Sequence, residues 1–133
     1  MTKTTEIIDK YADTIREAMI DAYKETLDHP NWQIKLYIWE SGKIDRLEGQ
    51  AGDNFELSSK DPEVFGELYK LTTIKGFDVF GELWDDGPIP EDEDTRNAFL
   101  EWAVSDYCER IDDELALVRA NWQQTEDFNE RYC

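Results

Sequence analysis

The sequence predicts one domain of the α+β class, spanning residues 1–133. We expect an N-terminal helix, a small antiparallel sheet of two or three strands, then short helices and a long C-terminal helix. Apolar residues recur at helical spacing near both ends of the chain, and a short stretch near residue 35 alternates apolar with polar residues. The length of 133 residues suits one domain, and a 13% aromatic content with five Trp indicates a packed core.

Residues 5–28 carry the clearest helical pattern. His29 should end this helix, because the residue before a proline avoids the α region. The apolar stripe consists of Ile8, Tyr11, Ile15, Ala18, Met19 and Ala22. The opposite side carries acids at four-residue spacing, namely Asp9, Asp13, Glu17, Asp21 and Glu25. Since Lys10 and Lys24 lie among them and Asp13 has Arg16 three positions later, we interpret this row as an ordinary solvated face.

Residues 33–39 are predicted to form a strand, because Ile34, Leu36 and Ile38 alternate with other residues. Residues 40–43 read as a turn and residues 44–48 as a return strand, which together give a hairpin. Residues 54–57 are the candidate for a short third strand.

Residues 61–71 are predicted to form a helix, since Asp61 can cap it and Pro62 suits its first turn. Residues 64–69 resemble residues 79–84 in sequence, so we expect a second short helix there; coincidence is the alternative. The segment 85–90, with Gly87, Pro88 and Pro90, is a predicted loop.

The final helix is predicted over residues 94–124. At a rise of about 1.5 Å per residue it would measure about 45 Å, against about 28 Å for a compact domain of this size. It should therefore either project from the domain or break. Its apolar face could also serve as the interface of a homodimer. That face consists of Leu100, Ala103, Val104, Tyr107, Ile111, Leu115, Val118 and Trp122.

Several classes of protein are disfavoured. A formal charge of −18 repels nucleic acid and anionic membranes, so we expect neither as a direct partner. The longest apolar run, 36–39, is far shorter than a membrane span, and the N-terminus shows no secretory signal. With only two cysteines, we expect a reduced, cytoplasmic protein. We expect no enzyme, cofactor or metal site, because there is one histidine, no phosphate-binding glycine motif and no zinc-ligand spacing.

The negative charge is concentrated in the C-terminal part. Residues 1–75 hold 15 acids and 10 bases, whereas residues 76–133 hold 17 acids and 4 bases. Unneutralised charge on this scale destabilises a compact fold by self-repulsion, so stability gives no reason to collect it. We expect the acids of the final helix to lack partners. Trp102 falls among them and would act as an interface anchor; the alternative is that it packs under the strands or short helices.

These observations predict a surface for a basic protein partner. Its candidate residues are Asp85, Asp86, Glu91, Asp92, Glu93, Asp94, Glu101, Trp102, Asp106, Glu109, Asp112 and Asp113. The first hypothesis is a non-enzymatic inhibitor of the anti-CRISPR or anti-restriction type. Its carboxylates would replace phosphates in the basic groove of a nucleic-acid-handling protein. The alternatives are an immunity protein that neutralises a basic toxin, or an intracellular acidic adaptor domain.

Overall fold

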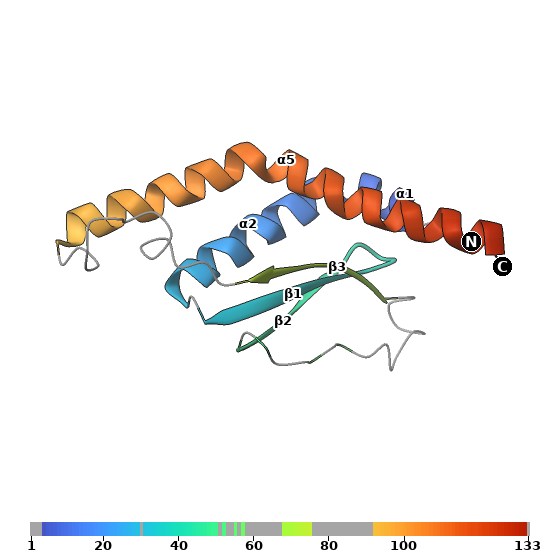
Figure 1. Cartoon of the computed structure of the whole chain (residues 1–133), viewed down its shortest axis with the longest axis horizontal. Helices are drawn as coiled ribbons and strands as arrows, with labels where there is room; N and C mark the ends of the chain where they lie inside the picture. The colour runs from blue at the N-terminus through green and yellow to red at the C-terminus, as the bar shows by residue number, and fades with distance from the viewer. Residues whose placement is uncertain are drawn as a thin grey trace.

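The protein has an α+β fold in which helices cover one face of a three-stranded sheet, as the sequence predicts (Figure 1). The computed structural model describes residues 4–29, 31–50, 52, 55, 57, 68–75 and 92–132, with backbone alone for 126–132. Its elements in chain order are α1 (Thr4–Lys10), α2 (Ala12–Asp28), β1 (Trp32–Trp39), β2 (Ile44–Gln50), β3 (Leu68–Lys75) and α5 (Glu93–Tyr132).

The predicted N-terminal helix is present but divided at Tyr11. The Tyr11 amide still donates to the Ile7 carbonyl at 3.0 Å, so the hydrogen-bond ladder continues through the bend. The Tyr11 ring lies against the turn after β1, where Gly42 adopts φ +92°. A Cβ on Gly42 would overlap that ring. The bend is therefore fixed by a tertiary contact, and α2 ends at Asp28 beside His29 as predicted.

The predicted hairpin is confirmed as β1 and β2, which pair antiparallel from Trp32 opposite Gln50 to Ile38 opposite Ile44. The sheet order is β2-β1-β3, so β1 is central and is buried along almost its whole length. Ile34, Leu36 and Ile38 join the hydrophobic core with residues of α1, α2, β3 and α5. Alternation in β1 thus sets one face of the sheet against the helices.

The third strand is β3, and the sequence assignment was wrong here. Residues 68–71 were predicted to end a helix, but they form a strand that pairs antiparallel with β1. The β-branched run of Thr72, Thr73 and Ile74 favours a pleated strand over a helix. Phe55 and Leu57, from the predicted strand at 54–57, belong to no strand. Residues 61–67 and 79–84, the rest of the two predicted short helices, lie outside the described residues.

Phe55 and Leu57 instead contact the sheet face that points away from the helices. Lys35 of β1 is only 5% exposed; its ammonium group donates to the Phe55 carbonyl and lies 4.6 Å from the centre of the Phe55 ring. The Leu57 amide donates to the Tyr37 hydroxyl at 3.4 Å. These contacts explain why β1 is buried on both faces, although the alternation in its sequence predicted one.

The C-terminal helix is continuous. Its 40 residues correspond to about 60 Å, so α5 projects beyond the sheet at both ends rather than breaking (Figure 1). Trp122 holds it against the sheet edge: the indole N–H donates to the Lys70 carbonyl at 2.8 Å, and the ring meets Tyr69 edge-on at 5.9 Å. The apolar face is buried in the chain's own core through Ala103, Tyr107, Ile111, Leu115 and Val118. Within the described ranges, no helix is both long and apolar enough to cross a membrane.

Candidate functional site: an acidic face on α2 and α5

Helices α2 and α5 lie side by side and run antiparallel. Tyr23 of α2 stacks on Tyr107 of α5, with ring centres 4.1 Å apart and planes at 6°. Nearer the start of α2, a guanidinium N–H of Arg16 lies 2.7 Å from a carboxylate oxygen of Asp112. Arg16 precedes Tyr23 in α2, whereas its partner Asp112 follows Tyr107 in α5, so the two helices are antiparallel. Exposed acids of α2 and α5 therefore lie on two neighbouring helices, although they are about 90 residues apart in sequence.

We call the resulting surface the acidic face. All of its members are exposed except Asp106, which is half-buried. Its residues are Asp13, Glu17 and Asp21 of α2 with Glu101, Asp106, Glu109, Asp112 and Asp113 of α5. Sequence reasoning treated the α2 row as an ordinary solvated face. The sequence analysis could not find this relationship, because it depends on tertiary contacts between α2 and α5.

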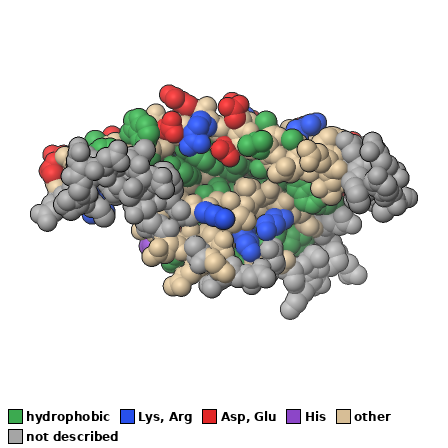
Figure 2. Space-filling view, in the orientation of Figure 1, with side chains coloured by type: hydrophobic (Ala, Val, Ile, Leu, Met, Phe, Trp, Pro, Cys, Tyr) green, Lys and Arg blue, Asp and Glu red, His purple; other side chains and the backbone are tan. Residues whose placement is uncertain are grey.

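Charge is divided between the two layers of the fold. Among the described side chains, residues 4–28 and 92–125 of the helical layer hold 16 acids and 6 bases, a net of −10. Residues 32–50 and 68–75 of the sheet hold 3 acids and 5 bases, a net of +2. In Figure 2 acidic groups gather along the upper rim, with some basic groups among them, whereas the charged groups seen lower, over the sheet, are basic. The helical layer is thus the negative pole of the molecule.

Two of the α5 acids in the predicted surface form ion pairs, which corrects the expectation that none would. Asp106 accepts from Arg110 at 3.1 Å, and Asp112 is held by Arg16 at 2.7 Å. Arg16 also binds Asp13 at 2.7 Å, so one guanidinium joins the two acidic rows. Exposed ion pairs of this kind contribute little to stability and are screened by salt. They reduce the local charge without removing the face.

Three further acids of the predicted surface, all in α5, have no ionic partner within the described part of the chain. Glu101, Glu109 and Asp113 are exposed and form no ion pair with any described side chain, and the same holds for Glu17 and Asp21 of α2. Five unpaired carboxylates on two neighbouring helices give a strongly negative local potential. A cationic partner could reach these carboxylates directly, because they are exposed at the surface.

Trp102 lies at the surface of α5 and not in the core. It is 52% exposed, and Leu117, fifteen positions later, is 60% exposed. They are the large hydrophobic side chains most exposed among the described residues. Large aromatic side chains at a surface are frequent anchors of protein interfaces. The position of Trp102 therefore agrees with an anchor and excludes packing under the strands.

The acids at the start of α5 have a local structural role. Asp92 caps the helix: its carboxylate accepts from the Thr95 amide at 3.2 Å and from the Thr95 hydroxyl at 2.7 Å. These hydrogen bonds lower the pKa of Asp92. Glu93 and Asp94 are exposed in the first turn, where the helix dipole favours negative charge. Asp85, Asp86 and Glu91 lie outside the described residues.

Asp9, the first acid of the α2-side row, is tied to the far part of α5. Its carboxylate accepts from Nε of Arg119 at 2.7 Å and from Nη2 at 3.0 Å. The hydrogen bond from Arg119 lowers the pKa of Asp9. Because this bidentate pair neutralises Asp9, we do not include Asp9 in the acidic face.

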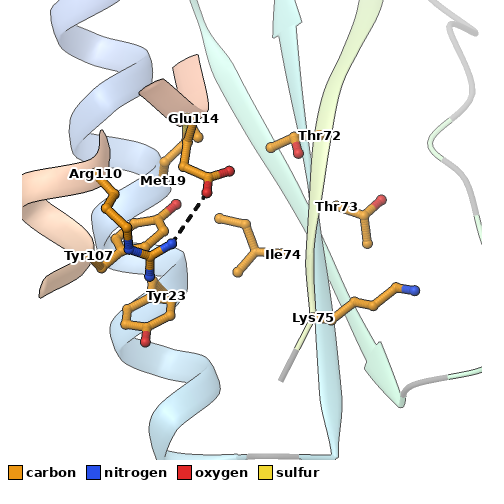
Figure 3. A pocket seen from close by; sticks show the side chains of 9 residues that line it. All are labelled: Met19, Tyr23, Thr72, Thr73, Ile74, Lys75, Tyr107, Arg110 and Glu114. Atoms are coloured by element: carbon orange, nitrogen blue, oxygen red, sulfur yellow. Dashed lines mark hydrogen bonds and ion pairs between the residues drawn. The ribbon is translucent and has the colours of Figure 1, made fainter. Parts of the chain in front are cut away.

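A groove between α2, α5 and β3 was not predicted, because its third wall is formed by residues 72–75 of β3, which the sequence analysis did not assign to a strand. It encloses about 310 Å³. Figure 3 shows the stacked tyrosines Tyr23 and Tyr107 on its helical side and the strand residues 72–75 opposite. Arg110 lies at the rim, paired with Glu114 at 3.5 Å. Burial raises the pKa of Tyr107, which keeps its phenol neutral.

Among the described residues, no group of three or more His, Cys, Asp or Glu side chains lies in an arrangement that could hold a metal ion. Comparison of the chain with protein-family models, with curated proteins and with solved structures finds no match.

Proposed function

We propose that this protein is a non-enzymatic inhibitor whose acidic face occupies the basic groove of a nucleic-acid-handling protein. One observation carries the proposal: on the neighbouring helices α2 and α5, the side chains of Glu17, Asp21, Glu109 and Asp113 are all exposed and form no ion pair with a described side chain. A fold needs no such collection for its own stability, since like charges repel. Binding to a groove lined with Lys and Arg would relieve the repulsion between like charges in both proteins.

The layout of the carboxylates supports replacement of phosphates. In the α2 row, Asp13, Glu17 and Asp21 follow at four-residue spacing, so each step rises about 6 Å along the helix. A nucleic-acid strand advances about 3.4 Å per phosphate, a distance of the same order. The exposed Glu101, Glu109 and Asp113 of the neighbouring helix α5 add further carboxylates. The whole chain, at a formal −18, would also accelerate encounter with a basic partner by long-range attraction.

Exposure of Trp102 favours a second candidate, an immunity protein that neutralises a basic toxin. An aromatic anchor with an acidic rim suits one dedicated pocket better than an extended groove. Both candidates use the acidic face against a cationic surface. They differ in what the partner normally binds.

The experiment compares two variants with equal charge change. E17K/E109K/D113K reverses carboxylates of the acidic face that form no ion pair with a described side chain, and E6K/D28K/E40K reverses three exposed acids that are not members of that face. Each immobilised protein is incubated with a lysate of the cells in which it acts, at low and high salt. Mass spectrometry then quantifies the proteins that are captured. We expect wild type and E6K/D28K/E40K to enrich the same nucleic-acid-binding protein at low salt, and E17K/E109K/D113K to lose it. Equal enrichment by both variants rejects the acidic face as the binding surface.

A further inference from the structure

A line of side chains along α5 points away from the core; we call it the outer seam. It consists of Trp102, Asp106, Glu109, Asp113 and Leu117, separated by four, three, four and four positions. The residues that follow Trp102 and Asp106, namely Ala103 and Tyr107, are buried against the other elements. The core contacts therefore fix the direction of the outer seam, which faces away from the sheet and from α2's buried residues.

We infer that the outer seam docks a basic, amphipathic helix of another protein. The inference rests on the proposed function and names the chemistry of its partner. Spacings of three and four residues are those by which two helices pack side by side. From Trp102 to Leu117 the seam spans about 22 Å, or about four helical turns. An apolar side chain marks each end, and carboxylates fill the middle.

The charges of the seam decide which helix it accepts. Asp106 is already paired with Arg110, so Glu109 and Asp113 are the carboxylates left for a partner. The matching helix carries Lys or Arg near its middle and apolar residues about four turns apart. Trp102 and Leu117 would then be covered by apolar contacts, with the ion pairs between them setting the register.

A second copy of this chain does not meet that requirement. In an antiparallel pair centred on Glu109, Asp106 would face the region of Asp113 in the other copy, and Glu109 would face its own counterpart. In a parallel pair every carboxylate would meet its own copy. Either arrangement sets like charges opposite each other at the centre of the interface, which opposes association. The occupant is therefore a different, cationic chain.

Two synthetic helical peptides of about 18 residues test the inference. The first has leucines near both ends and lysines between them, and the second has serines in place of the leucines at equal charge. Isothermal titration calorimetry measures the affinity of each peptide for the full chain. Wild type should bind the leucine peptide at least about tenfold more tightly than the serine peptide. W102A/L117A should bind the two equally.

The control variant, L100A/V104A, removes apolar surface from a neighbouring hollow between α2 and α5 and should keep the preference for leucine. Circular dichroism checks that each variant keeps the wild-type fold. Equal binding of both peptides by wild type, or an unchanged preference in W102A/L117A, overturns the inference. Self-association of wild type at low salt that W102A/L117A abolishes also overturns it, because the occupant would then be a second copy.

Failure of this inference is distinguishable from failure of the proposed function. If E17K/E109K/D113K loses its nucleic-acid-binding partner while wild type does not distinguish the peptides, only the inference is rejected. If the peptides are distinguished but the charge variants capture lysate proteins alike, the seam stands and the proposed function is rejected.

Discussion

Arg16 of α2 joins the two acidic rows: its Nε donates to Oδ1 of Asp112 at 2.9 Å, across 96 positions of sequence, and its Nη1 donates to Asp13 at 2.7 Å. One guanidinium thus neutralises an acid from each helix. Pairing with Arg16 lowers the negative charge that Asp13 and Asp112 can offer to a partner. The bond to Asp112 also links α2 to α5.

Removal of Arg16 should therefore strengthen binding to cations. In Arg16→Gln, Asp13 and Asp112 lose their cation and become available. We expect the lysine–serine peptide to bind a few-fold more tightly at low salt, and the gain to disappear at high salt. Calorimetry measures both affinities. The double variant R16Q/D112N should bind the peptide less tightly than Arg16→Gln, because one of the released carboxylates is removed. An affinity of Arg16→Gln equal to that of wild type would show that the ion pairs of Arg16 do not limit cation binding.

The pair between Asp9 and Arg119 should make stability depend on pH in the acid range. Because the pKa of Asp9 is lowered in the folded state, its contribution is present above the unfolded pKa of about 3.9 and is lost as pH falls through the folded value. Both side chains are half-exposed, so the contribution should be below about 1 kcal/mol. Urea unfolding of wild type and Asp9→Asn at pH 7 and pH 3 measures it. The difference between them should shrink at pH 3; a constant difference contradicts the assignment.

Burial of Tyr107 should make stability fall in alkali. Its raised pKa means that the folded state keeps the phenol neutral while the unfolded state ionises above about pH 10. The contribution is therefore full below about pH 10 and is lost as pH rises further. Tyr107→Phe should lose less stability than wild type between pH 9 and pH 11, as monitored by thermal unfolding. Identical losses would show that Tyr107 does not titrate in that range on unfolding.

Gly42 and Gly52 provide a matched pair for the bend at Tyr11. Both adopt positive φ, +92° and +95°, but only at Gly42 would a Cβ meet the Tyr11 ring. Gly52→Ala should cost about 1 kcal/mol of unfolding free energy for its backbone alone. Gly42→Ala should cost about 1–3 kcal/mol more, because the ring must also shift. Chemical denaturation measures both, and equal losses would contradict the contact between the turn and the helix bend.

Local patterns were sufficient for much of the fold. The stripe from Ile8 to Ala22 and the alternation of Ile34, Leu36 and Ile38 predicted the helical N-terminus and the hairpin, because the apolar residues of each segment line one face that packs in the core. The same reasoning failed at β3, where an aromatic-rich repeat suggested helices and outweighed the β-branched run that follows it. Tyr11 breaks its helix through a contact with Gly42, which no local pattern encodes.

The candidate site was predictable only in part. The concentration of charge and the position of Trp102 on the outer side of α5 follow from the sequence and its helical period. The ion pairs of Asp112 with Arg16 and of Asp9 with Arg119 span about a hundred residues, so they could not be anticipated from spacing. The union of two acidic rows depends on the antiparallel packing of α2 on α5. It also identifies Glu17 and Asp21, which the sequence analysis had not placed on the binding surface.

Displacement of nucleic acid from the captured partner tests the central claim most directly. A labelled duplex oligonucleotide is bound to that partner, and its release is followed by fluorescence anisotropy as the protein is added. Wild type and E6K/D28K/E40K should release the oligonucleotide at similar concentrations, and E17K/E109K/D113K should fail to release it. If the partner keeps its oligonucleotide when saturated with wild type, the acidic face does not take the place of phosphates.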